Sequence, residues 1–231
     1  MKLFIARRSA SAAAFVLNIP QSKNTSHGLS HDTALAMLAF AVSGNEYLRP
    51  RQAFHLPHIA KNEWGKPFFS DRSLPCFNWS HSGDWVFLAI SDCEVGVDIE
   101  VVRNRSRYLD IAERFYSQEE AEAVRKGGEN VFFLLWTMRE AALKLSGRGL
   151  AGSDELSLNP ASGICSLSGK SFKMSAAGKE EYPFGCDCNI SVASYEEDPP
   201  KEFFLIDWDS GSVSRLPIAF KSFSGGFFDL W

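Results

Sequence analysis

Short runs rich in apolar and β-branched residues alternate with polar turns along the first half of the chain. They predict strands at residues 2–6, 76–80, 85–91 and 95–101, the last three in close succession. Residues 31–42 are rich in alanine and leucine and predict a mostly buried helix.

Helical spacing returns further along, at residues 108–114 and 130–146. Between these segments, Ser117 with Glu120 three residues later predicts a capping box that starts another helix, which the glycines at 127 and 128 end. Gly147 and Gly149 stop the helix over 130–146.

After residue 156 the pattern changes to short alternating runs: ICSLSG, SFKMSA, CNISVASY and EFFLIDW. These runs predict an antiparallel sheet. Helices followed by strands in each half favour an α+β fold over alternating βα units. The apolar run near the N-terminus is cut by Arg7 and Arg8, so we expect a strand there and not a signal peptide, and no segment reaches membrane-spanning length.

Composition is ordinary for a soluble globular protein, with 45% hydrophobic and 23% charged residues among 231. Residues 1–66 carry 8 Lys and Arg against 3 Asp and Glu, but these charges are dispersed and predict no nucleic-acid partner. The odd cysteine count without a CxxC pair indicates reduced thiols and a cytoplasmic protein: Cys76, Cys93, Cys165, Cys186 and Cys188.

Two acids interrupt the apolar run GVDIE at residues 96–100. Asp98 and Glu100 are two residues apart in a predicted strand, so both point to one side, where their charges repel. They either lie on the wet face of a surface strand or hold a divalent cation such as Mg²⁺ between them.

The predicted helix at 130–146 carries Trp136, Glu140 and Lys144 at intervals of four, on one stripe of an otherwise largely apolar helix. The Glu and Lys are either a surface ion pair or two groups that face a site.

Four pieces occur in one order: GKP at 65–67, FNWSHS at 77–82, GVDIE at 96–100 and WTMREAALKLSG at 136–147. This set closely resembles the larger, monomeric, surfactin-synthetase type of 4′-phosphopantetheinyl transferase, over roughly residues 62–150. The resemblance implies a pseudo-dimer of two similar α+β halves, residues 1–95 with coenzyme A-binding elements and residues 96–231 with the metal-binding strand and catalytic helices. The active site would lie in the cleft between them.

The resemblance also implies the reaction, in which the phosphopantetheine arm of coenzyme A moves to a serine of an acyl or peptidyl carrier protein and adenosine 3′,5′-bisphosphate is released. Mg²⁺, or Mn²⁺ in its place, would be the cofactor. The expected metal ligands are Asp98, Glu100 and Glu140. The expected coenzyme A contacts are Lys66, Ser80, His81 and Lys144.

Lys66 would bind the 3′-phosphate of coenzyme A, while His81 and Lys144 would act on its pyrophosphate. Glu120 would be the base for the carrier serine, although the adjacent Glu119 leaves that assignment open.

Ser80 and His81 point to opposite faces of a strand, so they do not form a nucleophilic dyad with each other. A phosphate contact at the strand end is the interpretation we prefer. His81 by itself would be interpreted as a hydrogen-bonded turn histidine.

One position departs from the family pattern. The family often has a His-Arg pair at the start of an N-terminal helix, where the arginine binds the 3′-phosphate, but here Asp32 follows His31. The basic residues nearest to that helix in sequence are few: Lys23, Arg49 and Arg51. We therefore expect removal of the 3′-phosphate to matter less here than in other members.

Two other functions are alternatives. One is a non-catalytic coenzyme A or carrier-binding module of the same fold, and the other is a Mg²⁺ phosphohydrolase.

Three arginines alternate after the GVDIE strand and form either a solvated edge or a surface for an acidic carrier: Arg103, Arg105 and Arg107.

Overall fold

The computed structural model describes residues 1–17, 25–49, 52–102, 107–159, 162–178 and 187–223. Five residues considered from the sequence lie outside these ranges: Lys23, Arg51, Arg103, Arg105 and Cys186. Among the described cysteines, Cys76, Cys93 and Cys165 are free thiols. Among the described residues, no helix is long and apolar enough to cross a membrane.

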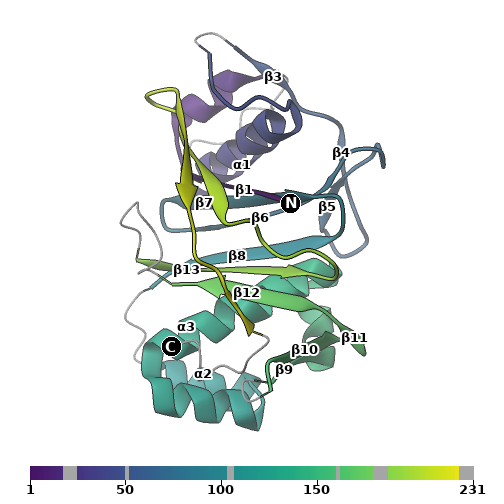
Figure 1. Cartoon of the computed structure of the whole chain (residues 1–231), viewed down its shortest axis with the longest axis vertical. Coiled ribbons are helices and arrows are strands. Elements are labelled where there is room, and N and C mark those ends of the chain that lie inside the picture. Colours follow the sequence, from purple (N-terminus) through teal and green to yellow (C-terminus); the bar gives the residue numbers. More distant parts are fainter. Residues whose placement is uncertain (18–24, 50–51, 103–106, 160–161, 179–186, 224–231) are drawn as a thin grey trace.

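The first large sheet has the strand order β15-β14-β1-β7-β6. The strands are β1 (Lys2–Arg7), β6 (Cys76–Ser82), β7 (Trp85–Ser91), β14 (Glu202–Asp207) and β15 (Ser212–Pro217). β1 and β14 are parallel, and the other neighbours are antiparallel. Helix α1 (Ser26–Val42) covers the outer face of this sheet (Figure 1), and Thr25 caps its N-terminus.

The second large sheet has the order β16-β12-β13-β8 and is antiparallel. Its strands are β8 (Val95–Val101), β12 (Lys173–Ala177), β13 (Cys188–Ser194) and β16 (Lys221–Ser222). Helix α3 (Gln118–Ser146) packs across its outer face, and α2 (Tyr108–Phe115) packs on α3.

Shorter elements surround these layers. Near α1 lie the 3₁₀ helix η1 (Ala10–Phe15) and the parallel pair β2 (Val16–Leu17) and β3 (Phe54–His55). The strands β4 (Ile59–Lys61) and β5 (Pro67–Phe69) form a hairpin. After α3 come η2 (Gly149–Glu155) and a three-stranded sheet of β9 (Leu156–Asn159), β10 (Ile164–Leu167) and β11 (Lys170–Ser171).

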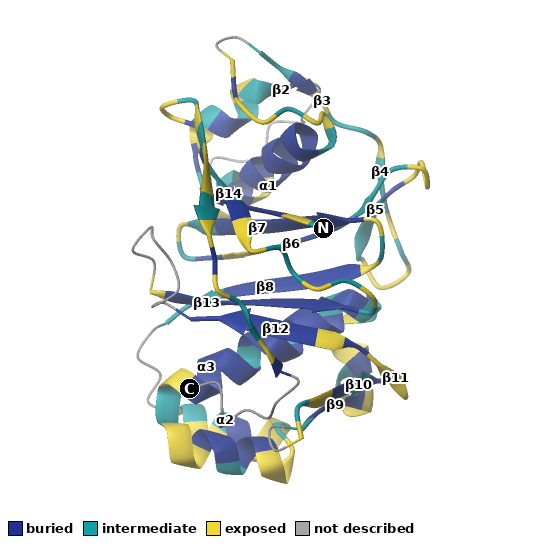
Figure 2. Cartoon of the chain, viewed as in Figure 1, coloured by how far each residue is buried: buried dark blue, intermediate teal, exposed yellow. Residues whose placement is uncertain are grey.

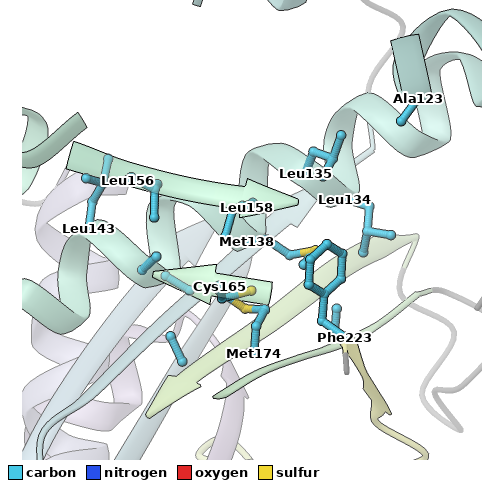
Figure 3. Packing of buried hydrophobic residues seen from close by; sticks show 14 of the residues in the cluster. Ala123, Leu134, Leu135, Met138, Leu143, Leu156, Leu158, Cys165, Met174 and Phe223 are labelled. Atoms are coloured by element: carbon cyan, nitrogen blue, oxygen red, sulfur yellow. The ribbon is translucent and has the colours of Figure 1, made fainter. Parts of the chain in front are cut away.

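Three apolar cores hold the layers together, and Figure 2 shows how completely the central strands are buried. One core lies between α1 and the first sheet, and another lies under α3, where Met138 meets Leu158, Cys165 and Met174 (Figure 3). The third core joins the two sheets, with Leu3, Ile5 and Phe87 packed against Val97, Ile99 and Ile190. The chain is thus a helix–sheet–sheet–helix stack of the α+β class.

The structure confirms the predicted strands and refines the helices. β7 and β8 have the predicted bounds, while α1 begins at Ser26, before the predicted start at residue 31. The predicted break near Gly128 appears as a non-helical residue (φ 70°, ψ −154°) inside α3, and Ser117 and Glu120 form the expected capping box.

The late strands do not form one antiparallel sheet, as we predicted. β12 and β13 belong to the second sheet and β10 to the small one, whereas β14 returns to pair in parallel with β1. The expected boundary between residues 95 and 96 falls after the first residue of β8, and β14 and β15, far beyond it, complete the sheet of the first half.

Candidate active site

The site is built where α3 approaches β8, and Gly96 makes this approach possible. A Cβ at residue 96 would lie 2.0 Å from the carbonyl oxygen of Ala141 and 2.3 Å from the amide nitrogen of Leu145. Only glycine therefore fits where helix and strand backbones meet. The contact brings Glu140 and Lys144 of α3 over the strand that carries Asp98 and Glu100.

Asp98 lies at the centre of this arrangement and is only 3% exposed. Its Oδ1 accepts hydrogen bonds from Ser80 Oγ (2.6 Å) and from Lys144 Nζ (2.6 Å), and Lys144 Nζ also donates to Ser80 Oγ (2.8 Å). Its Oδ2 is buried and has no hydrogen-bond partner among the described residues. Because buried carboxylate oxygens are normally satisfied, Oδ2 is a position suited to a cation.

A serine of β6 binds Glu100, just as Ser80 of β6 binds Asp98. Ser82 Oγ donates to Glu100 Oε2 at 2.8 Å and accepts a hydrogen bond from the amide of Val101 at 3.1 Å. Asn78, on the same face of β6, accepts from the amide of Val97 at 2.8 Å. Side chains of β6 thus join the edge strand of the first sheet to the edge strand of the second.

Glu140 completes a group of three carboxylates. Burial raises the pKa of Glu140 above its ordinary value, and the negative charges of Asp98 and Glu100 raise it further, while Lys144 opposes this. A hard divalent cation would favour the ionised form of Glu140 beside these two carboxylates, and oxygen donors of this kind are its preferred ligands.

No set of three His, Cys, Asp or Glu side chains in the described ranges already has the arrangement of a metal site. The Lys144 ammonium bonded to Asp98 supplies positive charge there in this structure. Together with the orphaned Oδ2 and the acid environment of Glu140, the residues fit a divalent cation by their chemistry.

His81 lies on the opposite face of β6 from Ser80, as the strand alternation predicts. Its ring meets that of His27 of α1 edge to face, at 5.5 Å between centroids. Partial burial lowers the pKa of His81, and His27 and Lys144 lower it further. A neutral imidazole is therefore favoured beside the site.

A cavity of about 720 Å³ opens next to these groups. It is lined by one face of α1, the segment before β4, the turn of the β4–β5 hairpin, β6 and the end of α3. Several of the lining residues carry side-chain nitrogen atoms: His31, His58, Lys61, Trp64, Lys66, Asn78, Trp79 and Lys144. A volume of this size is in the range of ligand pockets for a nucleotide-sized molecule.

Lys66 lines the cavity, but its ammonium is already engaged. Nζ lies 2.6 Å from Glu94 Oε2 and donates to the carbonyl oxygen of Leu145 at 3.1 Å, at the C-terminus of α3. Asn62 Nδ2 binds the carbonyl of Gly147 at 2.9 Å. The β4–β5 hairpin therefore anchors the end of α3, and a 3′-phosphate contact by Lys66 stays a prediction.

Asp32 is buried at 6% exposure and is not among the residues that line the cavity, whereas the preceding His31 is. The carboxylate thus lies within the fold and not on the cavity wall. The expected weak dependence on the 3′-phosphate stays a prediction.

The structure does not group Glu120 with the three carboxylates. Glu120 is completely buried; both of its oxygens lie 2.9 Å from Arg139 Nη1, and Oε2 also accepts from the amide of Ser117. These contacts describe a helix cap and a buried ion pair, while the neighbouring Glu119 is exposed. Whether either glutamate acts as a base stays a prediction.

The sequence did not identify three residues that bond to predicted site residues. Ser82 could have been found, because it is two residues from Ser80 and must share its face. Glu94 and Arg139 gave no such signal, because their partners Lys66 and Glu120 are distant along the chain.

Comparisons with known proteins find a similarity over the part of the chain that carries Asp98, Glu100, Glu140 and Lys144. Residues 94–182 match the model of the 4′-phosphopantetheinyl transferase superfamily. The 4′-phosphopantetheinyl transferase psf-1 of Bacillus pumilus is 44% identical over 93 residues, 38% of this chain and 38% of that protein. The 4′-phosphopantetheinyl transferase Sfp of Bacillus subtilis is 39% identical over 97 residues, 40% of this chain and 42% of that protein.

A relative from another group of bacteria gives a similar result. The 4′-phosphopantetheinyl transferase AcpT of Salmonella typhi is 41% identical over 97 residues, 40% of this chain and 50% of that protein. The matched part of the chain thus spans between 38% and 50% of the length of these three relatives.

Proposed function

We propose, from the match of residues 94–182 to the 4′-phosphopantetheinyl transferase superfamily, that this protein transfers the phosphopantetheine arm of coenzyme A to a serine of an apo acyl or peptidyl carrier protein. The single observation that supports this most is the bonded set of Ser80, Asp98 and Lys144, with Glu100 and Glu140 beside it. It adjoins a cavity large enough for a nucleotide.

Asp98, Glu100 and Glu140 would hold Mg²⁺, for which Mn²⁺ could substitute. When bound, the ion would neutralise the charge that develops on the pyrophosphate as its bond breaks. The buried Asp98 Oδ2 and the raised pKa of Glu140 beside Asp98 and Glu100 support this assignment.

The side chains around the acids would bind and orient coenzyme A. Lys144 lines the cavity and would donate to a pyrophosphate oxygen, and His81 and Ser80 would contact the phosphates at the end of β6. Lys66 would bind the 3′-phosphate if its ammonium leaves Glu94. The proton of the carrier serine would pass to Glu120 or Glu119.

We further propose that the protein acts as a monomer in the cytoplasm, with carrier protein and coenzyme A as its partners and with no nucleic acid or membrane partner. The free thiols of Cys76, Cys93 and Cys165 support a reducing compartment.

The test is intact-mass measurement of apo carrier proteins from fatty-acid, polyketide and peptide synthesis, each incubated with the protein, coenzyme A and Mg²⁺. We expect the mass of one phosphopantetheine arm to be added to at least one carrier. EDTA and Asp98→Asn should abolish the addition, and Lys144→Met should slow it at least ~100-fold, as for loss of a group that stabilises developing charge.

No mass increase on any carrier, together with tight binding of coenzyme A, would instead favour a non-catalytic coenzyme A or carrier-binding module. Increase that persists at full rate in EDTA would contradict the metal assignment while leaving the transferase activity in place.

A further inference from the structure

The inward side chains of β6 form a regular series along the edge of β8. Asn78, Ser80 and Ser82 are two residues apart and face the same way, and each of them reaches β8. Asn78 binds only backbone there, the amide of Val97. The two serines instead donate to the two carboxylates of that strand, one serine to each acid.

This pairing fixes which carboxylate oxygen is engaged. Ser80 and Lys144 both bind Oδ1 of Asp98, and the buried Oδ2 has no hydrogen-bond partner in the part of the chain that the structure describes. A hydroxyl that donates to one oxygen holds the carboxylate plane and leaves the second oxygen as a ligand. The two serines are themselves almost buried, each 7% exposed, so water does not readily replace their hydroxyl groups.

The two serines are not equivalent. Ser80 also accepts from the Lys144 ammonium, so its loss would disturb a proposed coenzyme A contact as well as Asp98. Among the described residues, the Ser82 hydroxyl has hydrogen bonds to Glu100 and to the amide of Val101, and none to Lys144. Ser82 is therefore the residue at which an effect on the acids can be separated from other effects.

We propose that Ser80 and Ser82 are positioning residues, which orient Asp98 and Glu100 for a divalent cation through the hydrogen bonds of their hydroxyl groups. The inference rests on the metal site of the proposed function. It gives Ser80 a role beyond contact with coenzyme A and gives Ser82 a role in the site. The rival explanation is that the serines only join β6 to β8, as Asn78 does.

A matched pair of substitutions separates the two explanations. Ser82→Thr keeps the hydroxyl and Ser82→Val replaces it with a methyl group of similar size, so both add equal bulk at this position. Ser191→Ala is the control: Ser191 lies directly opposite Asp98 in the β8–β13 ladder, is fully buried, and donates its hydroxyl to Thr137 at 3.0 Å. The Ser191→Ala substitution removes a buried hydroxyl next to the site without removing a hydrogen bond to Asp98 or Glu100.

The readout is Mn²⁺ affinity, measured from the electron paramagnetic resonance signal of the free ion, with and without coenzyme A. We expect Ser82→Val to weaken Mn²⁺ binding about 10-fold or more relative to Ser82→Thr, the range typical for residues that support metal ligands. Wild type, Ser82→Thr and Ser191→Ala should agree within about threefold. Circular dichroism and thermal unfolding establish that each variant is folded, and Ser82→Ala replaces Ser82→Val if the latter does not fold.

Equal Mn²⁺ affinity of Ser82→Val and Ser82→Thr would overturn the inference, and a loss of affinity in Ser191→Ala equal to that in Ser82→Val would do so too. If the wild type bound no Mn²⁺ in either condition, the metal site itself would be wrong and this inference with it. The carrier mass assay on the wild type then shows separately whether the transferase activity stands.

Discussion

At the scale of single residues, the buried acids differ in what compensates their charge. Asp98 is paired with Lys144, which is partly exposed, and its second oxygen has no hydrogen-bond partner among the residues that the structure describes. Glu120 is paired with Arg139, which is almost buried, and its oxygens are engaged by Arg139 and by the backbone of Ser117. The first arrangement can accept a ligand, while the second stabilises the start of α3.

We expect Arg139→Gln to destabilise the protein by about 3–5 kcal/mol, because it leaves the buried carboxylate of Glu120 without a cation. The double variant Glu120→Gln with Arg139→Gln should lose less free energy of unfolding than the two single variants lose in sum. Urea unfolding measures all three.

The control is Glu119→Gln, which changes an exposed neighbour and should alter stability by no more than about 0.5 kcal/mol. A large loss of transferase rate in this control at unchanged stability would identify Glu119 as the base. Additive losses in the double variant would contradict the buried pair.

His81 predicts a pH dependence of stability. Its folded pKa lies below the ordinary value of 6.5, because burial and the charges of His27, Lys144 and Arg8 outweigh the attraction of Asp98. The unfolded chain therefore binds the proton at a higher pH than the folded one. Stability from this group is complete above the unfolded pKa and falls as the pH decreases from 6.5 toward the lowered folded value.

We expect His81→Gln to reduce the loss of stability between about pH 7 and pH 5, measured by urea unfolding at each pH. Carboxylates elsewhere contribute to acid unfolding in both the wild type and His81→Gln. The quantity to compare is therefore the slope of the unfolding free energy against pH in the two proteins. Identical slopes would mean that the imidazole titrates as in the unfolded chain.

At the scale of elements, the site depends on where α3 lies. Its middle is set against β8 at Gly96, and its C-terminus is held by Asn62 and Lys66 of the β4–β5 hairpin. The lysine ammonium at the helix C-terminus also interacts favourably with the helix dipole. Glu140 and Lys144 are carried between these two anchors, so their position follows from the packing of the helix.

Gly96→Ala should destabilise the protein by about 3 kcal/mol, the upper end of the range for overpacking, because the new Cβ would meet backbone atoms that cannot rotate away. Thermal unfolding measures the change. Gly152→Ala is the matched control, since its Cβ would make only ordinary contacts, 3.6 Å from Leu143 Cδ2 at the nearest. A similar, small effect of both variants would contradict the close approach of α3 and β8.

At the scale of the whole molecule, the two sheets are mutually dependent. Their facing sides share one apolar core, and β14, late in the chain, pairs with β1 at its beginning. The chain must therefore close over a long sequence separation before the first sheet is complete.

We expect a fragment of residues 1–95 not to fold alone, because it lacks β14 and exposes Leu3, Ile5 and Phe87 of the shared core. Amide dispersion in a nuclear magnetic resonance spectrum and far-ultraviolet circular dichroism measure this. Mixing the fragment with residues 96–231 should restore structure, and a well-dispersed spectrum of residues 1–95 alone would contradict the dependence.

The sequence by itself determined the features that depend on neighbours along the chain. Period-two runs located β6, β7 and β8, and Ser117 with Glu120 located the start of α3 through a bond between residues three apart. The same local periodicity put Asp98 and Glu100 on one side of a strand. These are consequences of backbone geometry, which each short segment already contains.

Only the tertiary structure decided which of these groups meet. The chain brings Lys144 to Asp98, Ser82 to Glu100 and Glu94 to Lys66 across separations of many residues, and it buries Glu120 against Arg139. It also assigns β14 to the first sheet. Such contacts depend on the shapes of whole layers packed together, and no local pattern encodes which distant side chain will supply a charge or a hydrogen bond.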